Sequence, residues 1–346
     1  MITREKEPPN IEMPFGALDG FITPNERFYV RCHFPIPKIN ERDWRLRIEG
    51  KVARPFEVTM DDLRQMPAHT ITATLECAGN NRVFLVPKVK GVQWELGAVG
   101  NAEWTGVRLR DLLQRAEMAN DACEIIFEGA DNGTIAEPPR PAGKINFARS
   151  LPVEKAMDDV LLAFAMNGQA LSAAHGFPLR AVVPGWYGMA SIKWLQRIII
   201  TDQPFYGYYQ SIDYAFWRRD DAGSVLVPLT TMQVKAEIAR PENNEVIRAN
   251  SKYLVKGAAW TAEAIIVKVE VSCDGGESWG EATLDGKATE NAWRLWRLEW
   301  QTPAPGDYVL MARATDSRGR TQPLERDANS GTYMICHCLP IEVEVH

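Results

Sequence analysis

Hydrophobic and polar positions follow two different periods along this chain, and the change between them falls near residue 228. In the last third, Val267, Val269 and Val271 alternate with polar neighbours, which is the period of a strand with one buried face. Ile341–Val345 repeats this alternation close to the end of the chain. Short alternating segments separated by turn residues predict an immunoglobulin-like β-sandwich over residues 229–346.

The first 228 residues mix helical and strand periods. Val107–Met118 carries leucines at helical spacing and predicts a helix with one apolar face, and Asp61–Met66 predicts a shorter helix that ends before Pro67. Thr70–Leu75 predicts a strand, as do two β-rich runs, Ile125–Phe127 and Leu179–Val183. The sequence therefore predicts an α+β domain over residues 1–228, ahead of the sandwich.

Proline, glycine and alanine are frequent between Asp131 and Ser150, which predicts a long loop. Loops of that length inside a compact domain are more often functional than idle.

Composition narrows the classes of protein to which the chain belongs. Hydrophobic residues make up 45% and charged residues 24% of the 346 residues, so the chain is globular rather than disordered. A net charge of −6 argues against a nucleic acid or an anionic membrane as a general partner. The apolar runs are too short to span a bilayer, and the six cysteines are spread without framework spacing. We expect a cytoplasmic protein with reduced thiols, or a periplasmic one where a leader has been removed.

Cys77 opens the segment with the strongest local signal, Cys-Ala-Gly-Asn-Asn-Arg. It follows the strand predicted over Thr70–Leu75, and Arg82 lies five residues further on. A nearby guanidinium favours the thiolate, which is the form of cysteine that binds metals or attacks electrophiles. From this segment alone, a buried structural cysteine beside an unrelated arginine remains an equal alternative.

Two other segments carry groups that bind anions. Arg31 and His33 alternate in an extended segment, so both side chains reach the same face, where one anionic ligand would meet both. The segment from His175 to Trp194 combines Arg180 and Lys193 with several glycines, which let backbone amides approach a phosphate. A solvated edge strand and a glycine-rich connector are the structural alternatives.

Five motifs in this order resemble the sulfite oxidase family of molybdenum enzymes. They are Val-Arg-Cys-His, Cys-Ala-Gly-Asn-Asn-Arg, Ala-Glu-Trp-Thr-Gly-Val, Met-Asn-Gly and His-Gly-Phe-Pro-Leu-Arg with its following Ile-Lys-Trp. The resemblance covers nearly the whole chain. It implies a molybdopterin-binding domain that holds molybdenum as Mo-molybdopterin, followed by a sandwich that mediates a homodimer.

The resemblance also implies a function for each matching position. Cys77 resembles the thiolate that binds molybdenum, a thiophilic metal for which sulfur is a suitable ligand. Positions similar to those that bind the pterin are Tyr29, Val30, Arg31, Cys32, His33, Cys77, Asp131, His175, Arg180, Ser191, Ile192 and Lys193. Positions similar to the catalytic oxyanion pocket are Arg31, Arg82, Trp94 and Tyr214.

The chain departs from the family pattern at two places. Asn329–Cys338 contains no arginine where the sulfite-specific enzymes carry one, and Met189-Ala190 replaces the usual Ala-Arg before the Lys-Trp pair. Each missing guanidinium weakens the capture of a dianion. These departures therefore weaken the prediction of the substrate more than the prediction of the cofactor.

We therefore expect oxidation of sulfite to sulfate by oxo transfer. The electrons would pass to an external acceptor, namely a c-type cytochrome, another carrier or dioxygen. The alternatives are a nitrate reductase-like enzyme, an S-oxide reductase, or a non-catalytic binding protein in which Cys77 is structural.

Overall fold

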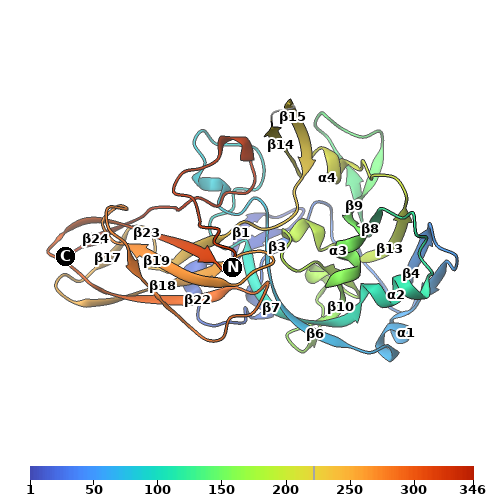
Figure 1. Ribbon diagram of the computed structural model, residues 1–346, viewed down its shortest axis with the longest axis horizontal. Coiled ribbons are helices and arrows are strands. Elements are labelled where there is room, and N and C mark those ends of the chain that lie inside the picture. The colour runs from blue at the N-terminus through green and yellow to red at the C-terminus, as the bar shows by residue number, and fades with distance from the viewer. Residues whose placement is uncertain (221–222) are drawn as a thin grey trace.

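The computed structural model describes residues 1–220 and 223–346, and it confirms an α+β domain followed by a β-sandwich. Figure 1 shows the two bodies side by side, with the C-terminus at the far end of the sandwich and the hairpin β14–β15 projecting from one edge. Among the described residues, no helix is both long and apolar enough to cross a membrane.

Two five-stranded sheets form the frame of the α+β domain. The first has the order β11-β10-β7-β6, and β12 pairs with β10. Its strands are β6 (His69–Glu76), β7 (Val99–Arg108), β10 (Leu161–Met166), β11 (Gln169–Ala170) and β12 (Arg180–Val182). The second has the order β5-β4-β13-β8-β9. Its strands are β4 (Leu46–Gly50), β5 (Phe56–Val58), β8 (Glu124–Thr134), β9 (Lys144–Pro152) and β13 (Leu195–Thr201).

Smaller elements complete this domain. A three-stranded sheet contains β1 (Ile2–Glu5), β2 (Asn10–Glu12) and β3 (Val30–Arg31), and the hairpin contains β14 (Ala215–Asp220) and β15 (Gly223–Pro228). The α-helices are α1 (Met60–Gln65), α2 (Leu109–Arg115), α3 (Val153–Asp158) and α4 (Tyr208–Ser211). Short 3-10 turns are η1 (Phe15–Ala17), η2 (Asn25–Arg27), η3 (Arg82–Phe84), η4 (Ala173–His175), η5 (Gly188–Ala190) and η6 (Ala328–Ser330).

The sandwich packs a four-stranded sheet against a five-stranded sheet. The first contains β16 (Lys235–Arg240), β18 (Lys252–Trp260), β22 (Arg294–Gln301) and β21 (Thr283–Leu284). The second contains β17 (Glu245–Ile247), β24 (Ile341–Val345), β23 (Gly306–Asp316), β19 (Ile266–Ser272) and β20 (Gly280–Glu281). The alternation predicted for Ile341–Val345 is confirmed, since its apolar side chains are buried and its glutamates are exposed.

Two predicted elements differ from the structure. The helix predicted over Val107–Met118 begins only at Leu109, because β7 continues to Arg108 through its pairing with β10. The loop predicted between Asp131 and Ser150 is wrong over most of its length. Asn132, Gly133 and Thr134 pair with the start of β9, so only residues 135–143 are irregular. Backbone pairing does not require apolar side chains, and composition alone therefore missed this hairpin.

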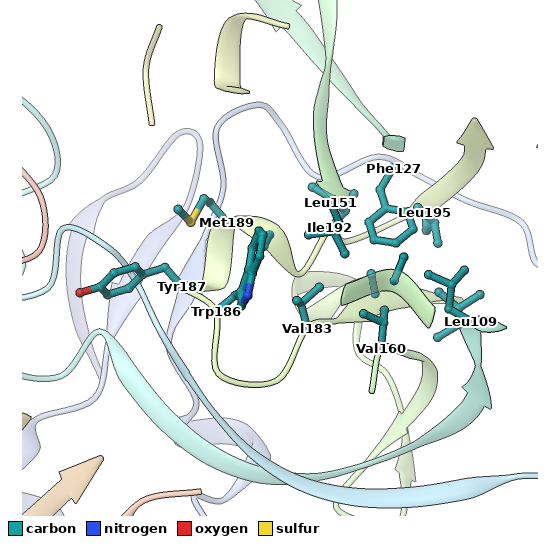
Figure 2. Close-up of a cluster of buried hydrophobic side chains, with 14 of the residues drawn as sticks. Leu109, Phe127, Leu151, Val160, Val183, Trp186, Tyr187, Met189, Ile192 and Leu195 are labelled. Atoms are coloured by element: carbon teal, nitrogen blue, oxygen red, sulfur yellow. The ribbon is translucent and has the colours of Figure 1, made fainter. Parts of the chain in front are cut away.

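The main hydrophobic core joins both sheets of the α+β domain and reaches the sandwich through Trp260 and Trp293. Figure 2 shows part of this core, with Phe127 of β8, Leu195 of β13 and Leu109 of α2. Ile192 belongs to this core and also borders the cavity described below. The core thus holds the segment that carries Ser191 and Lys193 in a fixed position.

Candidate active site

One cavity brings together most of the residues that the sequence predicted for the site. Its wall includes eleven of them: Tyr29, Arg31, His33, Cys77, Asp131, His175, Arg180, Ser191, Ile192, Lys193 and Tyr214. They come from β3, the end of β6, β8, η4, β12 and the segments that follow η5 and α4. Residues up to 185 positions apart in the sequence therefore share one cavity, and the structural alternatives of an edge strand and a connector do not describe them.

The Cys77 thiol lies where β6 ends and a tight turn begins. The Cys77 amide donates to the Ala98 carbonyl (2.9 Å), and the Cys77 carbonyl accepts from the Asn80 amide (2.8 Å), which closes the turn. Asn81 then has a φ of 74°, a left-handed conformation that asparagine tolerates better than most residues. This turn leaves the thiol at the cavity wall while the rest of the residue is buried.

Three cations line the cavity without a carboxylate partner among the described residues. Arg180 is 5% exposed and donates to the carbonyls of His175 and Ser191, each at 3.1 Å. Lys193 donates to the Ala174 carbonyl (2.9 Å) and to the Cys32 sulfur (3.2 Å). Burial lowers the pKa of Arg180 to about 10 and also lowers that of Lys193. Arg31 bonds to the Cys32 carbonyl and, at 3.3 Å, to Asn10 Oδ1.

The one carboxyl in this wall provides little compensating charge. Burial raises the pKa of Asp131 to about 7, so near neutral pH the group is only partly ionised. Burial, together with Arg180 and Lys193, lowers the pKa of His175 to about 4, so its imidazole is neutral. A buried cation is unfavourable unless a counter-charge meets it, so the cavity is built for an anion.

The donor set fits a molybdenum cofactor. A thiol in the wall offers the soft ligand that a thiophilic metal requires. The guanidinium of Arg180 and the ammonium of Lys193 offer the donors that hold a phosphate.

Tyr214 occupies the end of the cavity that adjoins α4. Its hydroxyl lies 2.7 Å from His33 Nε2, and its ring stands 5.1 Å from the ring of Tyr333, measured between centroids. Burial lowers the pKa of His33 well below its usual range, with a further lowering effect from Arg31. Neutral His33 therefore accepts or donates one hydrogen bond with Tyr214 and fixes where the phenol points.

Four predicted residues do not line the cavity. Val30 and Cys32 pack with Trp194 in a small cluster behind the wall, where Cys32 holds Lys193. Arg82 is buried and donates to the carbonyls of Thr332 (3.1 Å) and Val92 (2.8 Å).

Trp94 is the fourth of these residues. It is fully buried, and its indole Nε1 has no hydrogen-bond partner among the described residues.

Sequence reasoning missed two residues beside Tyr214. Tyr333 lies over the guanidinium of Arg82, with 5.1 Å between that group and the ring centroid, and its hydroxyl donates to Asp213 Oδ1 at 3.4 Å. Burial raises the pKa of Asp213. The segment Asn329–Cys338 lacks the arginine of the sulfite-specific enzymes, and Tyr333 within it is the signal that could have indicated this position.

Comparison with known proteins agrees with this geometry. The family described as "Oxidoreductase molybdopterin binding domain" matches residues 33–209, and "Mo-co oxidoreductase dimerisation domain" matches residues 227–336. Mitochondrial sulfite oxidase of Drosophila melanogaster is 38% identical over 343 residues, which cover 92% of this chain and 58% of that protein. Sulfite oxidase of Gallus gallus is 35% identical over 339 residues, which cover 92% of this chain and 72% of that protein.

A solved structure extends the similarity to the whole fold. The sulfane dehydrogenase SoxCD from Paracoccus pantotrophus superposes with a TM-score of 0.85 at 31% identity, covering 96% of this chain and 83% of the other. Fold and site together define a molybdopterin-dependent oxidoreductase. Within that class, the chain belongs to the sulfite oxidase family. It spans about 60% of the length of mitochondrial sulfite oxidases that it matches.

Proposed function

We propose that this chain oxidises sulfite to sulfate at a molybdenum centre and passes the electrons to an external acceptor. The observation that carries the proposal is the cavity in which a cysteine thiol, the buried Arg180 and the half-buried Arg31 and Lys193 converge. The balanced reaction consumes sulfite and water and yields sulfate, two protons and two electrons. The bound cofactor would supply the two-electron redox couple and oxygen-atom transfer, while the protein orients substrate and balances charge.

The predicted residues divide between two ends of the cavity. Cys77 would bind molybdenum, and Arg180, Lys193, His175 and Ser191 would hold the pterin and its phosphate. The proposal includes the remaining predicted contacts of the pterin, which are Tyr29, Val30, Arg31, Cys32, His33, Asp131 and Ile192.

The substrate end is built around Arg31 and Tyr214. Arg31 presents a guanidinium to the cavity, and Tyr214 presents a hydroxyl whose direction His33 sets. We propose that these two groups bind the substrate oxygens and the charge that develops on them, as preorganised donors do at other oxyanion sites. We propose that Arg82 and Trp94 support this pocket without lining the cavity. Arg82 donates to the Thr332 carbonyl and lies against the ring of Tyr333, and both contacts hold Tyr333 in place.

A sulfane sulfur is the second candidate substrate. Two observations favour it: the close structural match to the sulfane dehydrogenase, and the presence of Tyr333 and Asp213, rather than a further guanidinium, beside Tyr214. A further guanidinium would help to hold the oxygens of sulfite, whereas a terminal sulfane sulfur does not need that contact.

Steady-state assays of the molybdenum-loaded protein separate these candidates. Sulfite, thiosulfate, nitrate and methionine sulfoxide are each supplied, with ferricyanide as the oxidant for the first two and reduced viologen as the reductant for the others. We expect the highest kcat/KM with sulfite. A higher value with thiosulfate would favour the second candidate, and turnover of nitrate or the sulfoxide alone would overturn the proposal.

Four further parts of the proposal concern the whole protein. We propose a domain boundary between residues 228 and 229 and a homodimer formed through the sandwich. We propose that the acceptor is a c-type cytochrome, another carrier or dioxygen. Six free cysteines fit a reducing compartment, which supports a cytoplasmic location. Sequencing the N-terminus of the native protein tests the alternative of a processed periplasmic form.

A further inference from the structure

A buried charged cluster joins the sandwich to the turn that carries Cys77. Lys235, the first residue of β16, places its ammonium 2.8 Å from Glu76 Oε1 and 2.9 Å from Glu237 Oε1. All three side chains are nearly inaccessible to solvent, at 2–3% exposure. Glu76 is the residue directly before Cys77, so the sandwich contacts the backbone neighbour of the proposed metal ligand.

Two sandwich side chains hold the two oxygens of one carboxylate. Trp260 Nε1 donates to Glu76 Oε2 at 2.9 Å, while Lys235 holds Oε1. Lys235 and Trp260 are direct cross-strand partners in the β16–β18 ladder, so the sheet itself sets the spacing between the two donors. This arrangement fixes both the position and the rotation of the Glu76 carboxylate.

The same lysine also reaches the far side of the turn. Lys235 Nζ donates to Asn81 Oδ1 at 3.0 Å, and Asn80 Nδ2 donates to Glu76 Oε1 at 3.3 Å. Lys235 therefore contacts the chain both before and after Cys77. One side chain from the second domain spans the turn that presents the thiol.

The cluster places one ammonium between two carboxyl groups. Burial raises the pKa of Glu237 to about 7, despite the lowering effect of Lys235. Burial lowers the pKa of Lys235, but Glu237 and Glu76 raise it by more, so the ammonium stays charged. Apolar residues of similar volume would give a stable interface without the cost of burying ions, so stability alone does not account for this cluster.

We propose that Lys235 and Trp260 are positioning residues for the molybdenum site, acting through Glu76 to hold the Cys77 turn. The sandwich then has a second task besides assembly of a dimer, because the geometry of the metal ligand depends on it. The part of this inference that concerns molybdenum rests on the proposed function. The part that concerns the thiol can be tested in protein that holds no cofactor.

Two variants test this inference without leaving a buried charge unpaired. Trp260→Phe removes one donor to Glu76 and keeps an aromatic ring. The triple variant Glu76→Gln, Lys235→Met, Glu237→Gln replaces the whole cluster by neutral groups of similar length. Trp293→Phe is the matched control, since Trp293 is also a buried sandwich indole that donates to the first domain, but to the Phe21 carbonyl away from the turn.

The first readout is the alkylation rate of Cys77 by iodoacetamide in cofactor-free protein, followed by peptide mass spectrometry. We expect a change of about tenfold in Trp260→Phe and in the triple variant, which is the scale expected for losing a hydrogen bond to a charged group. Trp293→Phe should alkylate like the wild type even where its melting temperature falls equally. Equal rates in all four proteins would overturn the inference.

The second readout is molybdenum bound per chain after expression in a cofactor-competent host, together with the Mo(V) electron paramagnetic resonance spectrum. We expect less metal or an altered spectrum in the two test variants and wild-type values in Trp293→Phe. Wild-type values in the test variants would contradict the inference. A wild-type protein without molybdenum would overturn the proposed function instead, and the alkylation rates would still decide whether the turn is held by the sandwich.

Discussion

The cations of the cavity differ from a buried cation elsewhere in the protein because several of them line the same space. Arg149 is fully buried too, but it donates to the carbonyls of Tyr209 and Leu229 (both 2.6 Å) and connects α4 to the end of β15. Arg180 and Lys193 likewise bond to carbonyls, yet they share one wall with a thiol. Carbonyls satisfy the hydrogen bonds of a guanidinium without neutralising its charge. The convergence therefore indicates a site for an anionic ligand.

Replacing Arg180 by lysine should weaken cofactor retention. A lysine at this position keeps the charge but cannot reach the His175 and Ser191 carbonyls together with a phosphate. We expect about tenfold less molybdenum per chain, the scale of a lost charge-assisted hydrogen bond. Metal analysis of purified protein measures this, with Arg197→Lys on β13 as the control because Arg197 pairs with Glu49 and Glu128 instead. Full metal content in Arg180→Lys would remove Arg180 from the proposed phosphate site.

His175 should make the cofactor-free protein sensitive to acid. Its pKa is lowered to about 4 in the folded state, so between pH 6.5 and pH 4 the unfolded chain binds a proton that the folded chain does not. Stability is thus lost as pH falls through this range, by about 3 kcal/mol in total for this group. Urea denaturation at a series of pH values should show a smaller loss in His175→Gln than in the wild type. Parallel curves for the two proteins would contradict the assignment.

Residue identities in the site were predictable, whereas side-chain directions were not. The motif around Cys77 and the spacing of Arg180 and Lys193 indicated the anion site, and the structure brings them into one cavity. Arg82 was expected in the same pocket, but its direction depends on the Val92 and Thr332 carbonyls. Thr332 lies 250 positions away in the chain, so local sequence carries no information about that contact.

At the scale of elements, the stretch of chain that follows η6 packs against Tyr214 and the turn after Cys77, beside the cavity. The Met334 amide donates to the Ala78 carbonyl (3.0 Å), and the Thr332 carbonyl accepts from Arg82, so this stretch lies against the Cys77 turn. Tyr333 is thereby placed between Arg82 and Tyr214. A segment close to the C-terminus and the turn after Cys77 therefore pack together beside the cavity.

Removing the ring of Tyr333 should weaken substrate binding. Tyr333→Ala loses the aromatic face beneath the Arg82 guanidinium, an interaction of about 0.5–2 kcal/mol, and the contact with Tyr214. We expect the KM for sulfite to rise several-fold, with molybdenum content unchanged. Tyr333→Phe keeps the ring and should stay near the wild type. If both variants showed wild-type KM values, Tyr333 would not belong to the substrate end.

The sequence predicts strands where apolar and polar side chains alternate. It misses strand residues whose backbone pairs with a neighbouring strand but whose side chains show no such alternation. Ile341–Val345 shows its period directly, and β24 covers the same residues. The β8–β9 hairpin continues through Asn132 and Gly133, whose side chains carry no strand signal. The prediction placed the interior of α2 correctly. The first residues of the predicted helix, Val107 and Arg108, belong instead to the end of β7.

For the whole molecule, the two domains behave as one packed unit. The main core includes Trp260 and Trp293 of the sandwich, and Trp293 Nε1 donates to the Phe21 carbonyl (2.8 Å). Lys256 of β18 donates to the Leu18 carbonyl (3.1 Å). The β-sandwich was predictable from the strand period, but its contribution to the Cys77 turn was not, because Lys235 and Glu76 are 159 positions apart.

A dimer formed through the sandwich is a prediction at this scale. Light scattering coupled to size-exclusion chromatography should give twice the monomer mass of 38.9 kDa at micromolar concentration. A chain that lacks the predicted interface would elute at the monomer mass over the same range. In that case the sandwich would not form a dimer, and its function would be its contacts with the first domain of the same chain.

The central claim is that the sulfur of Cys77 binds molybdenum in an anion-binding cavity. The most direct measurement compares Cys77→Ser with Cys123→Ser, an exposed cysteine outside the cavity, for sulfite-dependent reduction of ferricyanide and for molybdenum per chain. We predict that Cys77→Ser loses turnover, even where pterin stays bound, and that Cys123→Ser keeps both wild-type values. Full sulfite oxidation by Cys77→Ser would contradict the account.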